Sequence, residues 1–71
     1  MVDNVKMYIN KLIADAVAVP EQALNFRGQA YGALMFALDN LNFTNGQKTV
    51  LVYFWDGAYK NFNQIYNEYI A

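Results

Sequence analysis

Apolar residues recur at helical intervals along most of the chain, in three segments separated by short breaks. In the first segment, residues 3–17, an apolar side chain returns every three or four positions, which is typical of an amphipathic helix. Asp3 or Asn4 precedes the pattern and is expected to cap this helix. Pro20 disfavours helical backbone at the residue before it, so the first helix should end by that point. The repeating apolar positions are Val5, Tyr8, Ile9, Leu12, Ile13 and Ala16.

The second segment, residues 20–42, is the longest one with a single unbroken period. As a helix it would span roughly 35 Å, about the diameter of a small domain. One of its faces is bulky and another carries small residues, including Gly28 and Gly32. Each glycine costs about 1 kcal/mol relative to alanine, so either a closely packed helix or an aromatic ring in the same core is expected beside them. The bulky positions are Leu24, Arg27, Tyr31, Leu34, Leu38 and Leu41.

The third segment supports two interpretations. Asn45-Gly46 followed by residues 49–55, rich in β-branched and aromatic side chains, is typical of a hairpin. Thr44 and Gln47, however, have the spacing of a capping box, and apolar residues continue at helical intervals up to Tyr69. We therefore predict a helix over 46–70. The expected fold is an all-α, three-helix antiparallel bundle in one domain, 1–71; the alternative is an α+β fold with a short hairpin at 43–55.

The length and composition predict self-association. A chain of 71 residues buries only about 60% of the surface that its unfolded form exposes. It has no cysteine or histidine to add disulfides or zinc, yet 56% of its residues are hydrophobic and 17% aromatic. In a helix, residues 50–55 would place apolar side chains on every side, and two neighbouring helices can cover only part of that apolar surface. We expect a homo-oligomer, most simply a dimer, through the third helix; the predicted interface residues are Val50, Tyr53, Phe54, Trp55 and Tyr59.

Charge and residue inventory exclude several function classes. Five basic and six acidic residues give a net charge of −1, which favours neither nucleic-acid binding nor a DNA mimic. The chain lacks His, Cys and Ser, so we predict no enzyme activity, no metal site and no cofactor. We also expect no membrane span and no secretory signal, because the apolar runs are too short. A cytoplasmic location is therefore expected.

Arg27 is the most unusual residue, because it lies within the bulky stripe of the second segment. A partly buried guanidinium needs an anionic partner. We expect a structural ion pair with Asp56 or Glu68. The alternative is a bound anionic ligand, with Arg27 and Tyr31 as the ligand-binding residues.

The motif RGQAYGALMFALDN, followed by a helix carrying Trp55 and Phe62, resembles small proteins encoded by bacteriophages and mobile elements of Gram-positive gut bacteria. The resemblance implies an accessory protein in the host cytoplasm, one that blocks a host defence system by binding it. The leading hypothesis is therefore a non-enzymatic helical interaction protein with a host protein as partner. The second hypothesis is a protein that sequesters an anionic metabolite or nucleotide signal at an oligomer interface.

Overall fold

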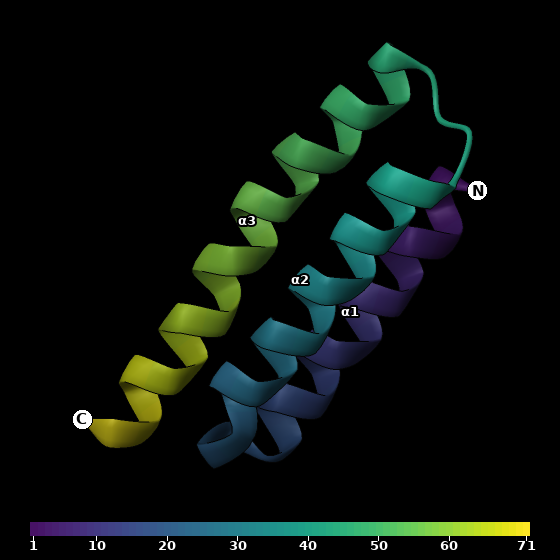
Figure 1. Cartoon of the computed structure of the whole chain (residues 1–71). Helices are drawn as coiled ribbons and strands as arrows, with labels where there is room; N and C mark the ends of the chain where they lie inside the picture. The colour runs from purple at the N-terminus through teal and green to yellow at the C-terminus, as the bar shows by residue number, and fades with distance from the viewer.

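Three helices account for nearly the whole chain (Figure 1). The computed structural model describes all 71 residues: α1 spans Val2–Ala18, a 3₁₀ turn (η1) spans Pro20–Gln22, α2 spans Ala23–Asn40 and α3 spans Asn45–Ile70. Each helix packs against the other two. The predicted all-α three-helix bundle is confirmed, and the alternative hairpin at 43–55 is wrong, since α3 includes most of that segment.

The start of α3 explains why the third segment is helical. The Thr44 hydroxyl accepts a hydrogen bond from the backbone N–H of Gln47 at 3.1 Å, and the backbone N–H of Thr44 donates to the Gln47 side chain at 2.9 Å. The predicted capping box is therefore confirmed. The capping box provides acceptors for the backbone N–H groups of Thr44 and Gln47. It thereby starts a helix where the Asn45-Gly46 pair alone would favour a turn.

The other helix ends differ in detail from the sequence prediction. The cap expected at Asp3 or Asn4 is wrong: α1 already begins at Val2, and no side chain caps it. Val2 packs against the core and so extends the helix by a residue. Asp3 lies instead in the first turn, where its carboxylate faces the positive end of the helix dipole.

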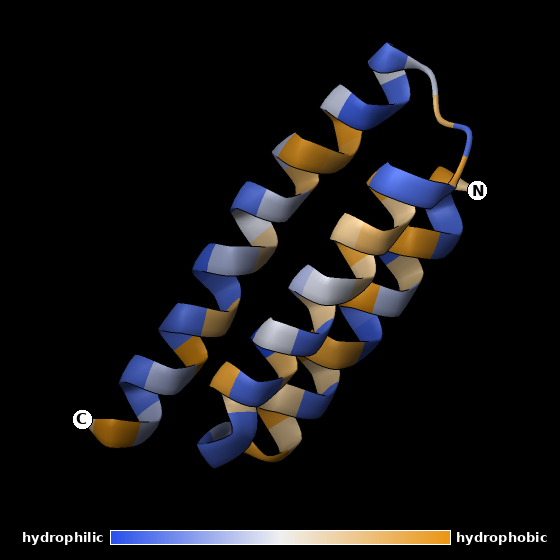
Figure 2. Ribbon diagram, in the orientation of Figure 1, coloured by the Kyte–Doolittle hydropathy of each residue, from blue (hydrophilic) through white to orange (hydrophobic).

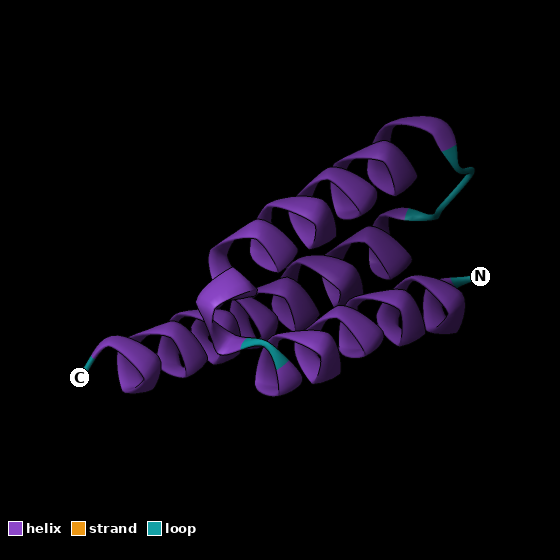
Figure 3. Ribbon diagram, turned by 90° about the horizontal axis from the view of Figure 1, so that it is seen from below, coloured by secondary structure: helices purple, strands orange, loops and turns teal.

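The break at Pro20 is confirmed, although it is longer than predicted. Val19 leaves the helical region, with φ −132° and ψ 72°, and Pro20 opens η1 and not α2 itself. α2 then ends at Asn40, two residues before the predicted Asn42, because Leu41 has extended backbone. Both connections remain short, so consecutive helices run antiparallel (Figure 3).

The core is built around the small face of α2, whereas the bulky stripe lies largely at its edges. Three alanines at seven-residue intervals, Ala23, Ala30 and Ala37, are buried together with Leu34. A seven-residue interval is close to two helical turns, so these residues share one face. Small side chains on this face let α1 and α3 approach closely. The eleven buried residues are Ile9, Leu12, Ala16, Ala23, Ala30, Leu34, Ala37, Phe43, Leu51, Ala58 and Phe62.

The bundle is a short rod of 40 × 16 × 15 Å, with the termini at opposite ends (Figure 1). α3, with 26 residues, is about 39 Å long at 1.5 Å per residue and therefore runs the full length of the rod. Its second half is mostly hydrophilic, whereas hydrophobic residues are frequent along α1 and α2 (Figure 2).

Candidate functional site

Aromatic rings from α2 and α3 meet on one side of the bundle. The ring of Tyr31 lies 5.7 Å from that of Trp55, which lies 6.1 Å from that of Tyr59, centroid to centroid. Val52 precedes Trp55 by three residues and Tyr59 follows it by four, so one face of α3 carries all three. Tyr31, Val52 and Tyr59 are 51%, 54% and 42% exposed. We call Tyr31, Val52, Trp55 and Tyr59 the aromatic surface.

The core holds the aromatic surface in place from below. The Trp55 ring is 6.5 Å from the ring of Phe62, which is fully buried. Trp55 itself is partly buried and packs against the core. Tilted ring contacts of this kind stabilise a pair by about 0.5–1.5 kcal/mol beyond the area they bury. The exposed rings are therefore held in fixed positions on a packed base.

Arg27 borders this surface, but its predicted carboxylate partner is wrong. Its Nη1 donates a hydrogen bond to the Asn63 side-chain oxygen, and its guanidinium lies over the Tyr59 ring, 5.0 Å from the centroid. The two ion pairs of the structure are Lys11–Asp15 and Lys60–Asp56.

The two carboxylates expected beside Arg27 are engaged within α3. Asp56 pairs with Lys60, and Glu68 accepts a hydrogen bond from Gln64, in both cases at a spacing of four residues. Neighbours one helical turn away satisfy these carboxylates more simply than a distant arginine does. The positive charge of Arg27 therefore faces an amide oxygen and an aromatic ring.

A shallow depression lies beside Arg27. Its volume is about 320 Å³, and its lining includes Gly28 from α2 as well as rings from both helices. The predicted ligand-binding residues Arg27 and Tyr31 therefore lie together, and the predicted interface residues Trp55 and Tyr59 line the same depression. An adjacent hollow extends along α3 and is lined by Val52, Trp55, Asp56 and Tyr59.

The two glycines of α2 lie on its exposed side. A Cβ atom added at Gly28 or Gly32 would have no neighbour within 4 Å. Neither expectation for them, a closely packed helix or an aromatic ring in the same core, is met within this chain. Their helix-propensity cost of about 1 kcal/mol each is therefore not offset by a contact in the monomer.

The predicted interface residues do not form one patch. Tyr53 and Phe54 line a separate groove between α1 and α3, together with Asn10, Ile13 and Gly57 among others. Phe54 is also covered by Lys6, whose Nζ lies 5.6 Å from the ring centroid. Val50 is exposed but lines neither the hollows beside Trp55 nor this groove.

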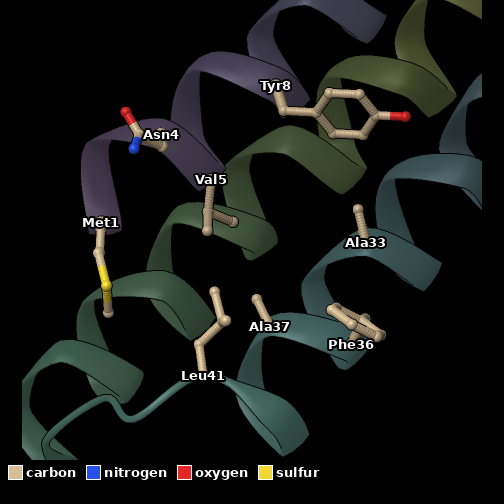
Figure 4. Close-up of a pocket in the computed structure, with 8 residues that line it drawn as sticks. All are labelled: Met1, Asn4, Val5, Tyr8, Ala33, Phe36, Ala37 and Leu41. Atoms are coloured by element: carbon tan, nitrogen blue, oxygen red, sulfur yellow. The ribbon is translucent and has the colours of Figure 1, made fainter.

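A fourth hollow, between α1 and α2, was not predicted from the sequence (Figure 4). Its volume is about 310 Å³ and seven of its eight lining residues are hydrophobic. In Figure 4 the rings of Tyr8 from α1 and Phe36 from α2 lie above and below Ala33, with Val5 and Ala37 to one side. The signal in the sequence was Phe36, a large apolar residue outside the bulky stripe of α2. The lining residues are Met1, Asn4, Val5, Tyr8, Ala33, Phe36, Ala37 and Leu41.

The acidic residues are dispersed over the surface. No three of them come close enough together to hold a metal ion. None of the three helices combines the length and the apolar character that crossing a membrane requires. The aromatic surface has Arg27 and Gly28 beside it, in one depression. Comparison of the chain with protein-family models, curated proteins and solved structures finds no match.

Proposed function

We propose that this chain is a non-enzymatic interaction protein that binds another protein chain through the aromatic surface. The observation that carries the proposal is the ring cluster itself: Trp55 packs against the core and contacts the rings of both Tyr31 and Tyr59, which remain exposed to solvent. Tyr and Trp are enriched in protein interfaces because their rings bury large apolar areas while their polar atoms stay hydrogen-bonded. Rings already fixed in place also lose little conformational freedom on binding.

The polar groups around the aromatic surface suit the rim of an interface. Arg27 and Asn63 lie at one edge and Asp56 at another. Interfaces typically surround an apolar centre with such hydrogen-bonding groups. We also propose that the protein is an accessory protein of a phage or mobile element that inhibits a host defence component by binding it.

Site-specific photo-crosslinking in the cell tests the proposal. A benzophenone amino acid replaces Tyr59 on the aromatic surface, and in a matched control it replaces Gln64, which is exposed on the same helix. We expect a protein adduct of defined mass from position 59 and none from position 64. Equal labelling at the two positions, or no protein adduct from position 59, would contradict the proposal.

A second candidate function is supported by the charge of Arg27. Its side chain has no carboxylate partner, and it lines the depression with Gly28, Tyr31, Trp55 and Tyr59. An arginine beside aromatic rings can pair with an anionic group while the rings stack on a planar one. The depression therefore suits a ligand that combines an anionic group with a planar ring, such as a nucleotide.

Trp55 provides a direct test of this second function, because it is the one tryptophan in the chain and lines the depression. Titration with adenosine monophosphate should change its fluorescence in a saturable way. Arg27→Gln should abolish the change, whereas Lys11→Gln, which removes a distant charge, should not. An unchanged spectrum at millimolar nucleotide would count against a site for this class of anion.

A further inference from the structure

We infer that the chain covering the aromatic surface is a second copy of this protein, placed so that α2 packs on the partner's α2 and α3 on the partner's α3, both antiparallel. The inference rests on the proposed protein-binding function and names the partner. The two-fold axis of this dimer lies in the interface between the two aromatic surfaces and runs perpendicular to the helices, from α2 to α3. Three observations carry it: the levels of the two helices, the spacing of the glycines and the spacing of two charges.

Contacts between α2 and α3 fix which of their residues lie at the same level. Arg27 reaches Tyr59 and Asn63, and Tyr31 contacts Trp55. Because the two helices are antiparallel, residues 28–32 of α2 therefore lie level with residues 56–60 of α3. A single axis across the helices can then pass near residue 30 and near residue 58 at once.

The glycines are symmetric about that axis. Gly28 and Gly32 are each two residues from position 30, so the two-fold operation places Gly28 opposite the partner's Gly32, and the reverse. Space is open above both positions. Without Cβ atoms, the two α2 backbones can approach closely, which brings the rings of Tyr31 and its partner copy into contact range. This offsets the helix-propensity cost that nothing in the monomer explains.

Two charges on α3 are symmetric about the same axis. Asp56 and Lys60 are each two residues from position 58, and their side chains are 68% and 75% exposed. The two-fold operation places Asp56 opposite the partner's Lys60 and repeats the pair on the other side of the axis. A surface facing its own copy thus meets complementary charge at both points, which selects this register over neighbouring ones.

The available area is sufficient for a dimer. A standard interface buries about 800 Å² on each partner, roughly a sixth of the 4596 Å² accessible surface of this chain. A bundle of three helices has three faces, so the α2 and α3 face alone offers that area. Association would also supplement a core of only 11 buried residues.

A charge exchange tests the register. Asp56→Lys alone places two lysines of one copy opposite two of the other, and Lys60→Asp alone does the same with carboxylates. Each variant should dissociate at roughly tenfold higher concentration than the wild type in sedimentation equilibrium. An equimolar mixture of the two should associate as heterodimers with about wild-type affinity, since every opposed pair is then attractive. Rescue by mixing cannot arise from the ion pair within one chain.

A glycine substitution tests the contact between the two α2 helices. Gly32→Leu adds a side chain where the monomer has open space. At concentrations where both proteins are monomeric, the variant should therefore melt no lower than the wild type, whereas its self-association should fall at least tenfold. Gly57→Leu is the matched control: it adds the same side chain in open space beside the α1 and α3 groove, and should leave association unchanged.

The outcomes separate this inference from the proposed function. Photo-crosslinking from position 59 that yields a 16.2 kDa species, twice the chain mass of 8.1 kDa, supports a second copy. An adduct with a different protein only, together with sedimentation as an 8.1 kDa species at high micromolar concentration, overturns the inference and leaves the proposed function standing. Self-association that is unaffected by the exchanges at Asp56 and Lys60 overturns the proposed register.

Discussion

The buried core of the bundle and the aromatic surface beside it contain opposite kinds of side chain. Five of the eleven buried residues are alanines, and only two, Phe43 and Phe62, are aromatic. The chain has six Tyr, five Phe and one Trp, so ten of its twelve aromatic residues lie outside the fully buried core. Most aromatic residues of this protein therefore lie at the edges of the core and on the exterior, whereas the centre consists of helices that pack closely on small residues.

The largest effect should come from comparing the loss of a phenylalanine in the core with the loss of one on the exterior. Phe62→Ala removes a fully buried ring and should lower the free energy of unfolding by about 3–5 kcal/mol, comparable to the whole stability of a small domain. Phe36→Ala removes the same ring where it is 64% exposed and should change stability by less than about 0.5 kcal/mol. Urea unfolding followed by circular dichroism at one protein concentration measures both. Similar losses in the free energy of unfolding for the two variants would show that the core and the exterior do not differ in this way.

Enlarging a small residue should also separate the interior from the exterior. Ala30→Leu inserts three carbons into the fully buried seam of α2 and should destabilise the protein by about 1–3 kcal/mol through overpacking. Ala14→Leu makes the same change at an exposed position of α1 and should be nearly neutral. Thermal melts of the two variants compare them directly. A neutral result at Ala30 would mean that the helices can move apart without loss.

A smaller effect is expected at the start of α3, the helix that contributes to both regions. Thr44→Ala removes the hydroxyl that accepts from Gln47 and should destabilise the protein by about 1 kcal/mol. Thr49→Ala is the control, because its hydroxyl bonds only to the Asn45 carbonyl within the same helix, and alanine is the better helix former. Equal losses at the two threonines would show that the cap contributes nothing specific.

The smallest effect should be found at the border between the two regions. A double-mutant cycle with Arg27→Met and Asn63→Ala should give a coupling energy of about 0.5 kcal/mol, near the lower end of the usual net contribution of a hydrogen bond, because this bond is only partly buried. The same cycle between Arg27 and Asp56 should give no coupling, since Asp56 pairs with Lys60. Coupling to Asp56 instead would restore the ion pair expected from the sequence.

Local signals in the sequence were sufficient to place the three helices, although not the start of α1, and they were insufficient for the packing of the helices. The capping box at Thr44 and the break at Pro20 depend on residues within one or two turns, and both were predicted correctly. The buried face of α2 was harder to identify, because its leucines and its alanines both recur at helical spacing. The choice between them depends on how closely three helices approach, which is a property of the whole bundle.

The candidate site was predicted in part, for similar reasons. Arg27, Tyr31, Trp55 and Tyr59 do lie together, because each faces the same seam between α2 and α3. The sequence analysis grouped Tyr53 with Trp55. Side chains two positions apart, however, are separated by about 200° around a helix, so these two point to different sides of α3. The Asp56–Lys60 pair was visible as a spacing of four residues, and this spacing already argued against Asp56 as the partner of Arg27.

The elongated outline of the bundle has a hydrodynamic consequence. Its radius of gyration is 12.3 Å, whereas a compact chain of this length would have about 11 Å. With a length of 40 Å against widths of 16 and 15 Å, a single chain tumbles and diffuses more slowly than a sphere of equal mass. In gel filtration it should therefore elute ahead of spherical standards of 8.1 kDa, and its apparent mass there will overstate the number of chains.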